Sequence, residues 1–137
     1  MNTLFHLAIN VTDLSLARQF YGDTLECKEG RSTETWVDFD FFGHQLSLHL
    51  GEVLSTQPTG RVGQHNVPMP HFGIILPLST FHTLAARLQA ANTPFDIPPC
   101  QRFTGEAGEQ YTMFFRDPFG NPIEVKSFTH ADEVYQS

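Results

Sequence analysis

The chain has 137 residues, a size typical of one compact domain or of two small modules. Its hydrophobic content of 40%, with 13 Phe, is enough for a core, and 17% charged residues argue against disorder. A net charge of -7 argues against nucleic-acid binding, and the longest apolar runs are too short to span a membrane. Without a recognisable signal peptide, we expect a cytoplasmic protein.

The first half of the chain has the pattern of a βαβββ unit. Residues 4–11 alternate between apolar and polar side chains, as a half-buried strand does. A helix follows, with Thr12 or Asp13 as its cap, and it should end near residues 22–25. Three short strands are then expected at residues 27–32, 35–41 and 45–50.

The second half repeats this order after an interruption. Residues 52–68 are rich in Gly and Pro, show no periodicity and predict a linker or a flexible loop. An alternating strand at 71–76 and a helix that stops before Pro94 come next. The remaining strands are expected at residues 95–103, 110–116 and 122–128.

The last strands of the two halves align with each other. Residues 41–49, FFGHQLSLH, match residues 118–126, PFGNPIEVK, and in this register Ser47 takes the place of Glu124. Internal repetition of a supersecondary unit is a strong indication of fold. We therefore predict an α+β protein of two paired βαβββ modules that form a curved, cupped sheet around a metal site. The expected boundaries are about 4–51 for module one, 52–68 for the linker, about 69–128 for module two and 129–137 for a tail.

Histidines and cysteines supply the candidate ligands and nucleophiles. Cys27 and Cys100 stand in unlike contexts, which predicts small buried or loop thiols and neither a disulfide framework nor a zinc motif. The seven histidines fall on strands (His6, His49, His71), in loops or turns (His44, His65, His130) and on a helix (His82).

The polar strand faces suggest a metal centre. His6, His71 and Glu124 belong to three strands, and two imidazoles with one carboxylate hold a divalent metal such as non-haem Fe(II) or Mn(II) with open positions. Each residue alone fits an ordinary strand position, but their matched places in the repeat favour metal binding. The resulting charge of +1 suits an anionic chelating substrate and then O₂.

The sequence at both ends of this repeat resembles a known superfamily. The opening segment reads FHLAINVTDLSLARQFYGDTL, and the closing segment reads FRDPFGNPIEVKSF. Both are similar to segments of the vicinal oxygen chelate superfamily, which includes glyoxalase I, the bleomycin-binding proteins, fosfomycin resistance enzymes and type I extradiol dioxygenases. CKEGRSTETWVDFDFFGHQLSLH and RFTGEAGEQYTMFFRDPFGN further resemble a bacterial branch of predicted extradiol-dioxygenase-like proteins. The likeness covers about residues 4–128.

The resemblance implies a metal-dependent dioxygenase-like enzyme acting on a small catecholic or vicinal-oxygen substrate. It places the metal ligands on His6, His71 and Glu124, with Fe(II) favoured over Mn(II), Zn(II) or Ni(II). The glyoxalase I pattern differs, because it has a fourth ligand on the last strand of the first module, where this sequence offers Gln45, Ser47 or His49 and no carboxylate. The alternatives are a glyoxalase-type lyase, isomerase or transferase, and a non-catalytic protein that sequesters a small molecule such as a drug. We expect a homodimer, with the modules paired either within a chain or across the dimer.

An extradiol mechanism also needs an acid or base near the metal, and His49 and Tyr111 are the candidates. For His49 an ordinary polar strand residue is weighed equally with the acid–base role, and a fourth ligand is a further alternative. Tyr111 would share a strand face with Met113 and Phe115, so a half-buried core tyrosine is the alternative. The segment 102–111, RFTGEAGEQY, either orients a substrate or is a solvated hairpin connection.

Overall fold

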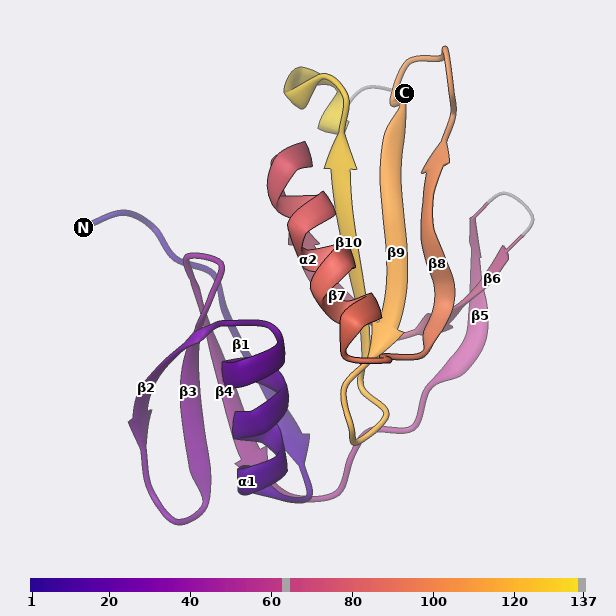
Figure 1. Cartoon of the computed structure of the whole chain (residues 1–137). Coiled ribbons are helices and arrows are strands. Elements are labelled where there is room, and N and C mark those ends of the chain that lie inside the picture. Colours follow the sequence, from indigo (N-terminus) through magenta and orange to yellow (C-terminus); the bar gives the residue numbers. More distant parts are fainter. Residues whose placement is uncertain (63–64, 136–137) are drawn as a thin grey trace. The chain divides into compact units, whose positions relative to one another are not determined.

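The computed structural model describes residues 1–62 and 65–135, and the chain divides into two compact units (Figure 1). The first unit contains residues 1–55 together with residues 117–121. The second unit contains the rest of the described chain. Among the described residues, no helix has the length and apolar character that crossing a membrane requires.

The first unit is a βαβββ module. Its elements are β1 (His6–Val11), α1 (Leu14–Ala17), the π-helical continuation η1 (Arg18–Thr24), β2 (Lys28–Ser32), β3 (Trp36–Phe41) and β4 (His44–Leu50). The strands form one sheet in the order β1-β4-β3-β2, in which β1 and β4 are parallel. Asp13 caps α1 by accepting a hydrogen bond from the backbone N–H of Leu16 at 3.0 Å, as expected from the sequence.

The second unit contains a module of the same topology. Its elements are β7 (Phe72–Ile75), α2 (Leu78–Ala90), β8 (Phe95–Arg102), β9 (Gln110–Arg116) and β10 (Pro122–Phe128), followed by the short 3₁₀ helix η2 (Ala131–Tyr135). The sheet order is β7-β10-β9-β8, in which Figure 1 shows β10, β9 and β8 side by side, and β7 pairs with β10 in parallel. The predicted α+β class and the two βαβββ modules are therefore confirmed.

The strand register also confirms the predicted alignment of the halves. Ser47 of β4 pairs with Ala8 of β1, and Glu124 of β10 pairs with Gly73 of β7. In each module a histidine comes two residues before that small partner: His6 opens β1, and His71 directly precedes β7. A Cβ atom at Gly73 would collide with the backbone carbonyl of Glu124, so only glycine permits the close approach of β7 and β10.

The segment 52–68 joins the two modules. The sequence predicted a linker or a flexible loop here, whereas the structure contains two strands. The segment contributes β5 (Gln57–Val62) and most of β6 (His65–Met69), which pair as an antiparallel ribbon in the second unit. Val67 of β6 is buried against Ile97 and Phe114, and the half-buried Cys100 packs on this cluster. The ribbon therefore covers part of the sheet face that does not carry α2.

The opposite faces of each sheet differ in chemistry. In β10 the side chains of Ile123 and Val125 are buried, whereas Glu124 and Lys126 alternate with them on the other face. Phe81, Leu84 and Leu88 of α2 are buried as well. In β4 of the first unit, the buried helix-side residues are Leu46 and Leu48. The period-2 alternation of both last strands thus leaves one polar face per module.

Candidate functional site

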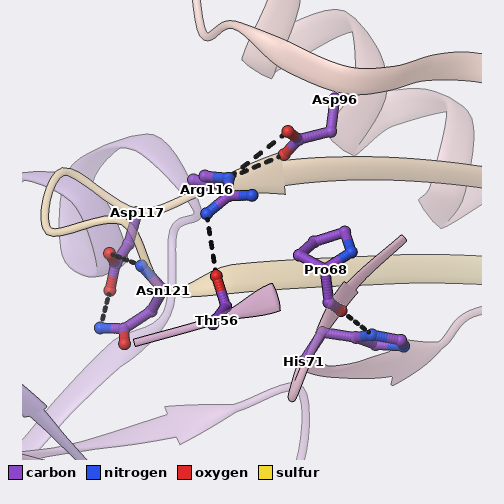
Figure 2. A network of polar contacts seen from close by, with 7 residues as sticks. All are labelled: Thr56, Pro68, His71, Asp96, Arg116, Asp117 and Asn121. Atoms are coloured by element: carbon purple, nitrogen blue, oxygen red, sulfur yellow. Dashed lines mark hydrogen bonds and ion pairs between the residues drawn. The ribbon is translucent and has the colours of Figure 1, made fainter. Parts of the chain in front are cut away.

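The clearest site in the second unit is a pair formed by His71 and Glu124. His71 lies just before β7, Glu124 lies on the adjacent β10, and imidazole Nε2 is 3.3 Å from carboxylate Oε1. The other ring nitrogen, Nδ1, is 2.8 Å from the backbone carbonyl oxygen of Pro68 (Figure 2). Because a carbonyl can only accept, the ring hydrogen belongs on Nδ1, and a neutral His71 then presents its Nε2 lone pair to Glu124. Two acceptors that face each other in this way suit a cation between them.

Neighbouring side chains fix both members of this pair. Thr112 Oγ1 donates a hydrogen bond of 2.9 Å to Glu124 Oε2, which leaves Oε1 for the histidine side. The ring of Phe114 meets the imidazole edge to face, with centroids 4.9 Å apart. Lys126 Nζ lies 3.7 Å from Oε1 of the same carboxylate. The pair is therefore half-buried and oriented, and it has one ammonium group beside it.

His6, the third predicted ligand, belongs to the first unit. It opens β1 opposite Gln45, and its side chain is exposed. The backbone of Phe5, the residue before His6, is hydrogen-bonded to β4. The N–H of Phe5 donates to His44 Nδ1 at 3.0 Å, and the carbonyl oxygen of Phe5 accepts from the N–H of Gln45 at 2.9 Å. His44, expected only as a turn residue, therefore fixes the chain that presents His6.

Inside either unit, the described residues contain no group of three His, Cys, Asp or Glu side chains that could hold a metal ion. Of the predicted ligand set, the second unit brings His71 and Glu124 together. The donor types of this pair, imidazole and carboxylate, fit a divalent transition metal. The third ligand, His6, stays a prediction.

The two predicted acid–base residues occupy different environments. His49 of β4 is exposed, and its ring lies 6.3 Å from that of Trp36. Tyr111 of β9 has ring contacts with Phe81 and His82 of α2, at centroid distances of 5.9 and 5.2 Å. Tyr111 thus faces the helix side of the sheet, opposite to Glu124, and this placement favours the core-tyrosine alternative. The role of His49 stays a prediction.

The segment 102–111 is organised by its own carboxylate. Glu109 Oε2 accepts the N–H of Gly105 at 2.7 Å, and its Oε1 accepts from Thr129 and Gln101, both at 3.0 Å. These hydrogen bonds, that from Gly105 first, lower the pKa of Glu109 below its ordinary value of 4.5. Because the carboxylate is occupied within the loop, the hairpin-connection interpretation is favoured over substrate orientation by Glu109.

A buried polar network in the first unit was not expected from the sequence. The carboxylate of Asp117 accepts four hydrogen bonds. Two come from Asn121, at 2.8 Å from Nδ2 and 2.9 Å from the backbone N–H (Figure 2), and the others come from Tyr21 Oη at 2.7 Å and the N–H of Phe119 at 2.9 Å. Asn121 also donates to the Asn10 carbonyl at 3.1 Å. Burial first, and then the charge of Asp117, raise the pKa of Tyr21 well above its ordinary value of 10.0.

A second carboxylate that sequence reasoning missed is Asp38 of β3. Its side chain is only 7% exposed and lies on the polar face of the first sheet. Ser47 Oγ donates to Oδ1 at 2.6 Å, and Gln45 Nε2 donates to Oδ2 at 3.2 Å. Strand alternation alone places Asp38 beside Ser47, so the available signal was the two acids, Asp38 and Asp40, that alternate with apolar residues in this strand.

Two βαβββ modules of identical topology define the class of fold found in glyoxalases and their relatives. A family model for the Glyoxalase/Bleomycin resistance protein/Dioxygenase superfamily matches residues 3–125. The chain belongs to this superfamily, as the sequence resemblance implied.

Solved structures agree with this placement. The chain is similar to a glyoxalase/bleomycin resistance protein/dioxygenase from Alicyclobacillus acidocaldarius, with 32% identity, a TM-score of 0.81, and coverage of 98% of this chain and 97% of that one. It shares its fold with the fosfomycin resistance protein FosX from Listeria monocytogenes, at 17% identity, a TM-score of 0.72, and coverage of 97% and 98%. A glyoxalase/dioxygenase from Nostoc punctiforme matches at 19% identity and a TM-score of 0.68, with coverage of 93% and 92%.

Proposed function

We propose that the protein is a metal-dependent enzyme of the extradiol-dioxygenase-like branch of this superfamily. His71 and Glu124, with His6 as the third ligand, hold one divalent metal, Fe(II) by preference. The substrate is a small catechol or another molecule with vicinal oxygens, and O₂ is the second substrate. The observation that carries the proposal is the His71–Glu124 pair, in which Nδ1 is tied to a carbonyl while Nε2 faces a carboxylate oxygen.

The surrounding residues have defined tasks in this proposal. The carbonyl of Pro68 keeps the hydrogen of His71 on Nδ1, so that Nε2 remains available as a ligand. Thr112 turns one oxygen of Glu124 away and leaves the other for coordination. A metal bound there supplies Lewis-acid activation of the two substrate oxygens.

We also propose that the protein acts as a homodimer. β1 and β7 are edge strands of their sheets, and an exposed strand edge is a surface that another chain can pair with. Apolar side chains are exposed at both strands, with 64% exposure for Phe5 just before β1 and 47% for Ile75 at the end of β7. Sedimentation analysis at low protein concentration tests this assembly.

Oxygen uptake tests the proposed reaction. Protein loaded anaerobically with Fe(II) is expected to consume O₂ with at least one member of a panel of substituted catechols, and the Zn(II)-loaded protein is expected to consume none. Turnover of a vicinal-oxygen substrate under Ni(II) or Zn(II) without O₂ uptake would instead assign the protein to the lyase and isomerase side of the superfamily.

One observation favours the alternative of a non-catalytic binding protein. The ammonium group of Lys126 lies 3.7 Å from the Glu124 oxygen that faces His71, where its charge competes with a metal cation. In the enzyme this charge weakens metal binding, whereas in a protein that only sequesters a small molecule it replaces the metal altogether.

Lys126→Met is therefore expected to raise the affinity for a divalent metal about tenfold, because a nearby positive charge is removed from a half-buried site. Competition with a chelating dye measures this change. Lys28→Met, at an exposed position of β2, is the matched control and should leave the affinity as it is. If neither substitution changes the affinity, the metal does not sit at the His71–Glu124 pair.

A further inference from the structure

The first unit contains a pocket that the proposed metal ligation does not explain. We call it the Asp38 pocket, and its volume is about 540 Å³. Its lining comprises Met1, Leu4, Phe5, His6, Gly30, Arg31, Asp38, Phe39, Asp40, Gly43, His44 and Gln45. A cavity of about 150 Å³ is enough to hold benzene, so the pocket has room for a substituted aromatic ring.

Apolar and polar groups alternate in this lining in a way that suits a hydroxylated ring. The exposed side chains of Leu4 and Phe5 supply apolar surface, and the carboxylate of Asp38 supplies the acceptor. A carboxylate has about four lone-pair positions, and the donors Ser47 and Gln45 occupy one position on each oxygen of Asp38. Each oxygen therefore retains acceptor capacity for a ligand O–H group.

His44 is a further hydrogen-bond donor in the same lining. Its Nδ1 accepts the N–H of Phe5, so the ring hydrogen of a neutral His44 is on Nε2. Among the described lining residues, two carboxylates, Asp38 and Asp40, stand against one guanidinium, Arg31. This balance disfavours an acidic ligand and favours a neutral one that donates hydrogen bonds.

We propose that the Asp38 pocket binds a mono- or dihydroxylated aromatic ring and that Asp38 recognises its hydroxyl group by accepting the hydrogen bond. The inference rests on the proposed function, because His6 lies in the same pocket and the ring is the substrate that would chelate the metal. The inference adds a residue, Asp38, that selects a ligand with a free hydroxyl group over the corresponding ether. A charge-assisted hydrogen bond is about twice as strong as a neutral one, so a carboxylate discriminates well.

Calorimetry on the EDTA-treated full chain tests the pocket without any metal. Wild-type protein is expected to bind catechol about tenfold more tightly than 1,2-dimethoxybenzene, which has the same ring but no O–H donor. Asp38→Asn should reduce this preference to less than about threefold, because the amide oxygen stays with Ser47 and the amide N–H₂ group cannot accept. Asp23→Asn, at an exposed position outside the lining, should keep the tenfold preference.

Ser47→Ala keeps the inference testable if the Asp38→Asn substitution disturbs the fold. Replacing Ser47 removes a donor and leaves the carboxylate, so the preference for catechol should persist or increase. Amide chemical-shift changes on adding catechol should fall on Gly43 and Gln45, which line the pocket. Equal binding of both ligands by the wild type, an unchanged preference in Asp38→Asn or a lost preference in Ser47→Ala would overturn the proposal. Since no metal is present, these results are independent of the proposed metal function.

Discussion

Replacing His71 with alanine is expected to weaken the binding of a divalent metal by more than about 100-fold, since even the loss of an outer partner of a ligand costs about 10–100-fold. The substitution removes the Nε2 lone pair that faces Glu124 at 3.3 Å. Oε1 of Glu124 would then face Lys126, while Oε2 keeps its hydrogen bond from Thr112, and an ammonium group satisfies the carboxylate without a metal. Metal analysis after purification, and competition with a chelator of known affinity, measure the effect.

His82→Ala is the matched control for this experiment. His82 is an exposed histidine of the same unit, and its ring contacts are with Phe81 and Tyr111 on the helix side of the sheet. Its removal should leave the metal content as in the wild type. Equal metal content in the wild type and in His71→Ala would remove the basis for the proposed enzyme and leave the fold assignment intact.

The fold and the equivalence of the two histidine positions could be predicted because they depend on short-range periodicity. Alternation with period two assigns each strand residue to a face, and the repeat of the Phe-Gly turn fixes the register. Ser47 and Glu124 were matched on that basis, and their partners Ala8 and Gly73 confirm the match. The same alternation placed Tyr111 with Met113, on the side where the structure has it.

What the sequence could not indicate depends on contacts between distant residues. Tyr21 and Asp117 are separated by 96 positions, and no local pattern connects them. The ribbon of β5 and β6 contains Pro and Gly, and its apolar and polar side chains do not alternate. A two-stranded ribbon packed on another sheet need not expose one polar face, so the periodicity of the sequence did not indicate these strands. Asp38 lies on a predicted strand, but its burial follows from the side chains of Gln45 and Ser47 on the neighbouring strand.

The two modules use one topology for two kinds of polar face. In the second unit the acid is on the last strand, as Glu124, and the hydroxyl group that orients it comes from Thr112 on the neighbouring strand. In the first unit the arrangement is exchanged, with the hydroxyl group of Ser47 on the last strand and the acid, Asp38, on the neighbour. In our two proposals the first arrangement would bind a cation and the second would accept a hydrogen bond from a ligand hydroxyl group. The exchange would then give modules of one topology different tasks.

Asp117→Ala is expected to reduce the free energy of unfolding by about 4 kcal/mol, because it leaves several buried donors without an acceptor. Asp117 is 4% exposed, and its carboxylate accepts from Tyr21, Phe119 and Asn121. Tyr21→Phe removes a single donor and leaves Asn121 on the same oxygen, so its expected cost is about 1.5 kcal/mol. Urea unfolding followed by circular dichroism measures both values.

The repeat itself supplies the control for Asp117. Asp40 occupies the equivalent place before the Phe-Gly turn of the first module, where its Oδ1 accepts the N–H of Gly43 at 2.7 Å. Asp40 is exposed, so water can replace this acceptor, and Asp40→Ala should cost no more than about 1 kcal/mol. If the two substitutions cost the same, burial of the Asp117 network does not contribute to stability as argued. A larger cost at Asp117 would show that the buried network stabilises the fold by anchoring this turn to Tyr21.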